Sequence, residues 1–182
     1  MSTAYIISVT AIIFDFDRVL ITKRLPNASR FPGRWTVPGG RLEPADYTDI
    51  QPTADGVRYG AIETALRREV QEEVGLEIGE LQYIASMVMP GDTPRIFLSF
   101  STTRIGGELR LQEAEVAAAQ WVTRFEVQQM RQGILIDGIS DEIEHAFDLR
   151  SKFDLINVIG TNPCAEIPFL NELSGGARHA KE

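Results

Sequence analysis

The sequence predicts a single α/β domain of the α+β type, in which strands surround one long helix. Two apolar runs, 5–14 and 19–24, flank the polar residues DFDR in the manner of a hairpin. From Val57 to Val74, apolar residues recur at spacings of three and four, and Gly75 follows as a helix stop signal. The chain has 182 residues, 43% of them hydrophobic, which is enough for one substantial core.

Segments rich in Pro, Gly and Asn separate the elements before the helix. After the hairpin and a loop, residues 35–44 predict a short strand that runs into a Gly-Gly turn. The polar stretch 45–56 predicts a surface loop, and we place an insertion at about 47–60.

The elements after the helix are mostly strands. Thr123 and Glu126 have the spacing of a capping box and predict the start of a short helix. We therefore expect one domain over 1–150 and a partly flexible extension over 151–182. The other elements expected in this part are strands at 81–89, 94–103, 108–111 and 118–122, and a last helix at about 140–149.

Charge and cysteine content limit the possible partners and compartment. A net charge of −8 argues against binding to a nucleic-acid polymer, because such binding depends on Lys and Arg that neutralise phosphates. The single Cys164 excludes an internal disulfide and suits a reducing compartment. No apolar run approaches the roughly 20 residues of a membrane span, so we expect a cytoplasmic protein without a membrane partner. A homodimer is compatible with the sequence.

Three glutamates share one turn of the long helix. Glu69, Glu72 and Glu73 stand at i, i+3 and i+4, where like charges repel one another. They also lie near the helix C-terminus, whose dipole is negative. A divalent cation would remove both penalties, and a set of oxygen ligands suits a hard ion such as Mg²⁺, with Mn²⁺ as an alternative.

The segment around these glutamates resembles the Nudix box. Residues 68–76, REVQEEVGL, match the second half of that motif, Arg-Glu-apolar-x-Glu-Glu-x-Gly-apolar, at every specified position. WTVPGG, residues 35–40, is similar to the segment that leads into the box. With Gly40 as its first glycine, the box has Asp46 where the family has Glu. Asp46 and Arg68 are then separated by 21 residues instead of seven, which implies an insertion of 14 residues.

The resemblance implies a fold, an activity and a metal site. The Nudix fold is a mixed β-sheet sandwiched between helices, and Nudix hydrolases cleave a phosphoanhydride in a nucleoside diphosphate derivative with Mg²⁺. By resemblance, Arg68 holds a glutamate in place, Glu72 and Glu73 act in catalysis, and the substrate is a small-molecule nucleotide. The implied metal ligands are the carbonyl of Gly40 and the carboxylates of Glu69, Glu72, Glu73 and Glu115.

The general base and the substrate contacts are less constrained by the sequence. Family members often supply a further Glu from the loop before the Trp-containing strand, where we favour Glu115 over Glu113; Glu72 is a third candidate. Arg24 and Arg34 lie on segments expected to border the cleft and to meet phosphates. Phe31 is a candidate for stacking against a base.

Two alternative functions remain at this stage. Asp15-Phe-Asp17 after an apolar strand resembles the first motif of haloacid-dehalogenase-type phosphatases, whose first Asp is the nucleophile. Against this, Lys23 is the only Lys between that motif and the later DGISD, and Arg18 replaces the usual Gly. The second alternative is a Nudix-fold module that senses a nucleotide without cleaving it, which the altered first half of the box permits.

Overall fold

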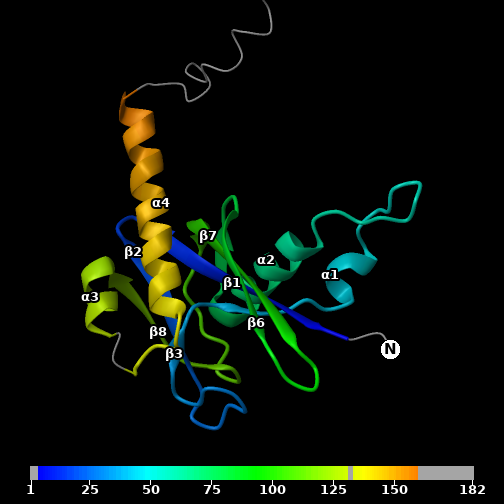
Figure 1. Ribbon diagram of the computed structural model, residues 1–182, viewed down its shortest axis with the longest axis horizontal. Helices are drawn as coiled ribbons and strands as arrows, with labels where there is room; N and C mark the ends of the chain where they lie inside the picture. The colour runs from blue at the N-terminus through cyan, green and yellow to red at the C-terminus, as the bar shows by residue number, and fades with distance from the viewer. Residues whose placement is uncertain (1–3, 131–132, 160–182) are drawn as a thin grey trace, which may run out of the picture. The chain divides into compact units, whose positions relative to one another are not determined.

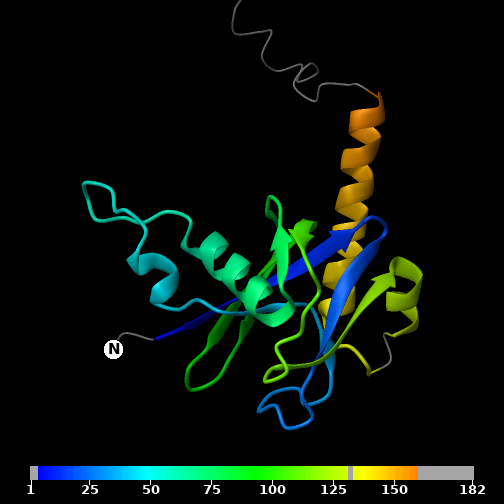
Figure 2. The same ribbon diagram turned by 180° about the vertical axis from the view of Figure 1, so that it is seen from behind.

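One mixed sheet with helices on both faces organises the residues that the structure describes. The computed structural model describes residues 4–130 and 133–159. In Figures 1 and 2, α2 (Ala61–Val74) and the beginning of α4 (Ile139–Ile159), up to Phe147, lie on opposite faces of the sheet. The strands are β1 (Ile6–Asp15), β2 (Arg18–Arg24), β3 (Trp35–Thr36), β4 (Gly39–Arg41), β5 (Leu76–Ile78), β6 (Gln82–Met89), β7 (Arg95–Gly107) and β8 (Val116–Thr123), and the helices are α1 (Ala45–Thr48), α2 (Ala61–Val74), α3 (Arg124–Gln129) and α4 (Ile139–Ile159).

Strand β1 lies in the middle of the sheet and contributes to the core on both faces. It pairs in parallel with β7 and antiparallel with β2 and β4. Because side chains alternate along a strand, Val9 and Ile13 face α2, whereas Phe14 faces α4 and meets Phe147 edge-on at 5.0 Å. Each fully buried aliphatic side chain of this kind contributes about 1.5–3 kcal/mol. The core therefore anchors α2, which carries the three glutamates, to the centre of the sheet.

The N-terminal hairpin is confirmed. Phe14 pairs with Val19, and Asp15 pairs with Arg18. Phe16 takes a left-handed conformation, with φ of 54°, at the turn. The carboxylate of Asp15 forms an ion pair with Arg104 at 3.1 Å.

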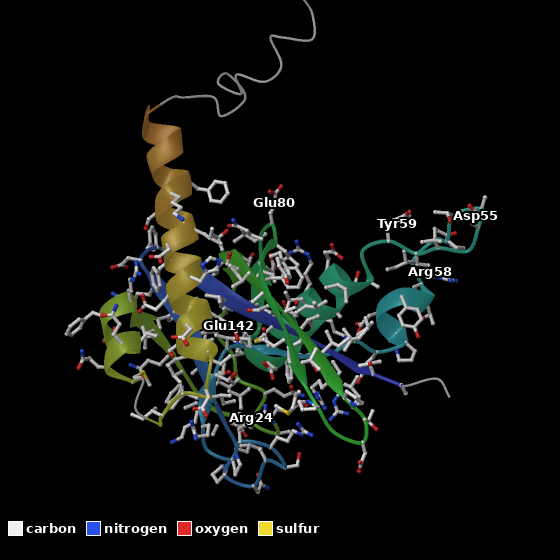
Figure 3. The ribbon with its side chains drawn as sticks, in the orientation of Figure 1. Arg24, Asp55, Arg58, Tyr59, Glu80 and Glu142 are labelled. Carbon is white, nitrogen blue, oxygen red and sulfur yellow. The ribbon has the colours of Figure 1, made fainter. Side chains whose placement is uncertain are left out.

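The long helix begins later than its apolar period suggests. We expected it from Val57, but α2 begins at Ala61, after Gly60 in a left-handed conformation with φ of 84°. Without a Cβ, Gly60 can adopt this conformation, which redirects the chain before the helix begins. The part of the predicted insertion before Gly60 lies outside regular structure after α1, and its side chains Asp55, Arg58 and Tyr59 project from an exposed loop in Figure 3.

Other predicted elements differ in detail. Residues 108–111 form no strand, because the backbone N–H of Arg110 bonds to the carbonyl of Val74 at the end of α2. Strand β5 was not predicted, and the Gly-Gly pair expected in a turn belongs to β4. The last helix is longer than expected and reaches Ile159. The capping box of Thr123 and Glu126 is confirmed in both directions.

A boundary between two compact units falls within α4, between Phe147 and Asp148. The predicted extension over 151–182 lies mostly outside the described residues, as does Cys164. No helix among the described residues is long and apolar enough to cross a membrane.

Candidate active site

Helix α2 presents its glutamates at two depths. Val70 and Val74 are fully buried on its inner face. Glu69 and Glu73 are each 8% exposed, whereas the side chain of Glu72 is 51% exposed. The helix ends at Gly75, whose φ of 70° closes the last turn. Two carboxylates thus lie against the protein interior and the third reaches solvent.

The short strand β4 holds the two buried carboxylates. The N–H of Gly39 donates to Glu73 Oε2 at 2.9 Å, and the N–H of Arg41 donates to Glu69 Oε1 at 3.0 Å. A Cβ on Gly40 would lie 2.1 Å from the carboxylate of Glu69. A glycine at this position is therefore required for the carboxylate to approach the strand.

The register of β4 against β1 decides where its carbonyls point. Leu42 N–H bonds to the carbonyl of Ile7, and Ala11 N–H bonds to the carbonyl of Pro38. Since hydrogen-bonded pairs alternate in an antiparallel ladder, Val9 and Gly40 form the bonded pair between them. The Gly40 carbonyl then faces Val9, away from the glutamates, so the expected carbonyl ligand does not fit this register.

Arg68 and Asp46 meet across the insertion. Arg68 donates to the Asp46 carboxylate from Nε at 2.6 Å and from Nη2 at 3.0 Å. The same guanidinium lies 3.0 Å from Glu72 and 3.1 Å from Glu69, and it donates to the carbonyl of Arg41 at 3.0 Å. Arg68 thus ties two of the glutamates to β4.

Asp46 is placed for this contact by α1. It is 2% exposed, and it accepts a hydrogen bond from the N–H of Glu43 at 2.7 Å. The hydrogen bonds from Arg68 hold the pKa of Asp46 below its usual value of 3.8. Asp46 therefore lies beside Arg68, although the insertion separates the two residues in the chain.

Burial makes the two inner carboxylates costly to ionise. It raises the pKa of Glu73 to about 7, although the hydrogen bond from Gly39 opposes the shift and the charges of Glu69 and Glu115 add to it. Burial also raises the pKa of Glu69, against the nearby charge of Arg68. A cation between these groups would favour their ionised forms, which is the electrostatic condition for a metal site.

The carboxylate oxygens of these glutamates suit a hard divalent ion, but the side chains do not converge on one point. Among residues 4–130 and 133–159, no three acidic, His or Cys side chains are close enough together to hold a metal ion as they stand. Arg68 accounts for this, since it draws the carboxylate of Glu72 toward itself. Glu69 and Glu73 supply the buried oxygen atoms, and Glu72 would have to turn away from Arg68 to join them.

The loop before β8 brings Glu115 toward the same region. The N–H of Gln112 bonds to the carbonyl of Glu73 at 3.0 Å, and the N–H of Glu115 bonds to the carbonyl of Gln112 at 2.9 Å. Glu115 is exposed, yet its charge is close enough to raise the pKa of Glu73. Glu113, in the same loop, is also exposed.

The predicted substrate contacts separate into two groups. Arg24, at the end of β2, lies close enough to lower the pKa of Glu73. Arg34 turns elsewhere and donates to the carbonyl of Leu135 at 2.5 Å and to Asp137 at 3.3 Å. Phe31 lies in the exposed loop between β2 and β3, with φ of 49° and 38% of its surface exposed. Arg24 alone of the three has a described electrostatic link to the glutamates.

Two surface hollows are described, one beside β4 and the other at the hairpin turn. One of about 580 Å³ lies beside β4, and its lining includes Arg41, Glu43 and Tyr47. Another, of about 410 Å³, surrounds the hairpin turn near Asp15 and Trp121. The convergence of charged groups defines the candidate site better than these shallow hollows, because metal and phosphate chemistry needs those groups.

Sequence reasoning missed two contributors to the site. Gly39 and Arg41 act through their backbone N–H groups, and no side-chain pattern reveals which edge of a strand a backbone group faces. The segment WTVPGG was the available signal, since a Gly-Gly pair permits close approach of another chain segment.

Comparison with known proteins identifies the family. The sequence model of the NUDIX domain matches residues 4–136. The chain belongs to the Nudix family. The computed fold agrees: it resembles the MutT protein of Methanosarcina mazei Go1, with a TM-score of 0.61 and 24% identity over 84% of this chain and 99% of that one. It also resembles the NUDIX domain of Shewanella oneidensis NrtR solved with ADP ribose, with a TM-score of 0.62 and 18% identity over 82% and 90% of the two chains.

The curated relatives are longer proteins. The human NAD-capped RNA hydrolase NUDT12 is 30% identical over 105 residues, which cover 58% of this chain and 18% of that protein. The Pseudomonas aeruginosa NAD-capped RNA hydrolase NudC is 39% identical over 61 residues, which cover 34% of this chain and 22% of that protein. The matched part of this Nudix chain thus corresponds to about a fifth of each relative.

Membership of the Nudix family confirms the predicted fold, a mixed sheet between helices in a single domain. It also removes the basis for the phosphatase hypothesis. Asp15 ends a strand of a hairpin and pairs with Arg104, whereas that hypothesis needs it as a nucleophile at the edge of a parallel sheet.

Proposed function

We propose that this Nudix domain hydrolyses a phosphoanhydride bond in a nucleotide or nucleoside diphosphate derivative and requires a divalent cation, Mg²⁺ in the first instance. The observation that most directly supports this proposal is the pair of buried carboxylates, Glu69 and Glu73, held by the backbone of β4. Two buried negative charges on one helical turn are unfavourable unless a cation joins them. Both glutamates belong to the segment that matches the Nudix box, whose glutamates are the expected metal ligands, and this supports the proposal.

The proposed ligands are the carboxylates of Glu69, Glu72 and Glu73. Bound there, a divalent ion would supply charge neutralisation for phosphoryl oxygens and a more acidic water. Gly39, whose N–H already faces α2, replaces Gly40 as the proposed source of a backbone ligand. Arg68 acts as a positioning residue, because it contacts Asp46 and Glu72 and thereby orients the acidic turn.

Glu115 is the proposed general base. Its backbone is tied through Gln112 to the end of α2, and its carboxylate is exposed, so that it is accessible to water. Glu113 remains the alternative within the same loop. Single replacements by Gln separate them, and the variant that loses kcat while retaining its affinity for the metal identifies the base.

The substrate class follows from what the relatives have in common. NAD-capped RNA and ADP ribose, which occur in the names of the relatives and of a structural neighbour, both contain a pyrophosphate attached to adenosine. We therefore propose substrates in which a pyrophosphate joins a nucleoside to a second group. The net charge of −8 favours small nucleotides, and a capped RNA is the second candidate.

A panel of nucleotides tests this function. Product formation is measured with Mg²⁺ for nucleoside triphosphates, ADP-ribose, NAD and a nucleotide sugar, with an EDTA blank. We expect Glu72→Gln and Glu73→Gln to lower kcat at least about 100-fold. Glu63→Gln, on the exposed first turn of the same helix, is the matched control and should retain full activity. Nucleotide binding without turnover under all conditions would instead favour the sensing module.

A further inference from the structure

Four arginines gather on one side of the candidate site. Arg24 ends β2, Arg30 lies in the loop after it, Arg41 ends β4 and Arg95 begins β7. We refer to these four residues as the arginine cluster. They come from segments up to 71 positions apart, so their meeting is a product of the fold.

The sheet brings two of the four together. Arg95 donates from Nη1 to Ser8 Oγ at 2.9 Å. Ser8 is the cross-strand partner of Arg41 in the β1–β4 ladder. Directly opposed residues of an antiparallel pair have Cβ atoms about 4.5–5.5 Å apart, so Arg41 and the guanidinium of Arg95 approach the same serine.

The loop after β2 adds the other two. The guanidinium of Arg30 contacts Met89 Sδ at 2.6 Å, and Met89 is the cross-strand partner of Arg95 in the β6–β7 ladder. Arg24 donates from Nε to the carbonyl of Arg30 at 2.9 Å. In Figure 3, the side chain of Arg24 lies at the lower part of the sheet, on the side of this loop.

The side chains of the cluster form no ion pair among the described residues. Other arginines of this chain, such as Arg104 with Asp15 and Arg68 with Asp46, do form ion pairs, but none of the four does. Arg95 Nε is buried and has no hydrogen-bond partner within residues 4–130 and 133–159. Like charges that form no ion pair are energetically unfavourable. The chain has a net charge of −8, so it contains more than enough carboxylates to pair with these arginines.

The titration of Arg95 agrees with this geometry. Burial lowers the pKa of Arg95, and the charges of Arg41, Arg30 and Arg24 lower it further. Arg41 lies at the end of the cluster nearest the glutamates, because its backbone N–H donates to Glu69 Oε1 at 3.0 Å. The cluster therefore begins beside the glutamates and extends away from them, along the sheet toward Arg95.

We propose that the arginine cluster is a second anion site, which binds a phosphate group of the substrate other than the two joined by the bond that is cleaved. This rests on the proposed function, since the glutamates and their metal would hold the cleaved pyrophosphate. Guanidinium groups are suited to the task, because their planar set of N–H donors matches phosphate oxygens. Two sources share this chemistry: the additional phosphate of a nucleoside triphosphate, and the first phosphodiester of a capped RNA.

Binding of inorganic tripolyphosphate tests the site without any catalysis. Titration calorimetry is carried out in EDTA, so that the glutamates cannot contribute through a metal. We expect binding to the wild type, and about a tenfold higher Kd for Arg95→Gln and for Arg30→Gln. Arg58→Gln, on the exposed insertion, is the matched control and should leave Kd unchanged. Equal Kd values for all four proteins, or no binding to the folded wild type, would overturn the proposal.

Kinetics with paired substrates identify the source of the phosphate. ATP is compared with ADP-ribose, and an NAD-capped oligonucleotide with NAD. We expect Arg95→Gln and Arg30→Gln to lower kcat/KM about tenfold for the member with the additional phosphate, and less than twofold for its partner. The substrate pair that shows this difference in kcat/KM identifies the source of the bound phosphate. Equal losses within both pairs would overturn the proposal, whereas tripolyphosphate binding without turnover of any nucleotide would contradict only the proposed hydrolysis. Arg30→Gln, in a loop, keeps the test valid should Arg95→Gln fail to fold.

Discussion

Arg68 binds the carboxylate of Asp46 through two hydrogen bonds, of 2.6 and 3.0 Å, although the two residues are 22 positions apart in the chain. The insertion therefore does not prevent the two residues from forming an ion pair. Asp46 is nearly fully buried, while the side chain of Arg68 is 23% exposed. Replacing Asp46 removes two charge-assisted hydrogen bonds and leaves Arg68 with only the carboxylates of Glu69 and Glu72 as ion-pair partners among the described residues.

We predict that Asp46→Asn lowers the free energy of unfolding by about 2 kcal/mol at pH 7, as measured by urea denaturation. The pKa of Asp46 is lower in the folded protein, so this contribution is present above pH 3.8 and is lost as the pH falls through the folded-state value. Asp55→Asn, on the exposed insertion, is the control. Equal stability of wild type and Asp46→Asn would contradict the role assigned to the ion pair.

Addition of Mg²⁺ should stabilise the folded protein. A ligand that binds only the native state raises Tm with its concentration, and here it also relieves repulsion between Glu69 and Glu73. Differential scanning fluorimetry with increasing Mg²⁺ should show this rise in the wild type and in Glu63→Gln. The rise should be absent in Glu73→Gln, and the same rise in that variant would place the ion elsewhere.

Gly40→Ala should weaken the metal site and leave the stability of the fold almost unchanged. The added Cβ would lie 2.1 Å from the carboxylate of Glu69, a flexible side chain that can move away at the cost of its place in the site. We expect at least about a tenfold weaker apparent affinity for Mg²⁺ in the activity assay, with little change in Tm. Gly91→Ala, where a Cβ meets open space, is the control.

Gly39→Ala, in contrast, should destabilise the fold itself. Its φ is 149°, and its Cβ would lie 2.1 Å from the backbone carbonyl oxygen of Val9 in the centre of the sheet. Because backbone cannot move aside as a side chain can, we expect a marked fall in Tm. An unchanged Tm in Gly39→Ala would contradict the geometry of β4.

Glu142, at the start of α4, should make stability depend on pH. It is 8% exposed, and its Oε2 has no hydrogen-bond partner among the described residues. Burial raises the pKa of Glu142 above 4.5, with Ser99 opposing the shift and Asp141 adding to it. The folded state then holds the proton more tightly, so stability is lost as the pH rises from 4.5 through the folded-state value.

We therefore expect Glu142→Gln to be more stable than the wild type at pH 8, by about 1 kcal/mol, and nearly equal to it at pH 4.5. Urea denaturation at both pH values measures the difference. Glu63→Gln should show no such dependence. A Glu142→Gln protein that loses stability at pH 8 would mean that the charged carboxylate has a stabilising partner.

The local elements and the acidic turn of α2 could be predicted from the sequence alone. The period of apolar residues placed Val70 and Val74 on the buried face of α2, and the spacing of Glu69, Glu72 and Glu73 placed them on one turn, because helix geometry relates residues three and four apart. The hairpin at Asp15 and the capping box at Thr123 followed for the same reason, since each depends on interactions between near neighbours in the chain.

How segments that are distant in the chain complete the site depends on the tertiary structure. Strand register turned the N–H groups of Gly39 and Arg41 toward the glutamates and the Gly40 carbonyl toward Val9. It also brought Arg95 to Ser8, beside Arg41. Sequence spacing carries no information on which edge of a strand faces a helix, because that depends on pairing between segments far apart in the chain. The glutamates could thus be predicted from the sequence, whereas the backbone that holds them and the arginines beside them required the fold.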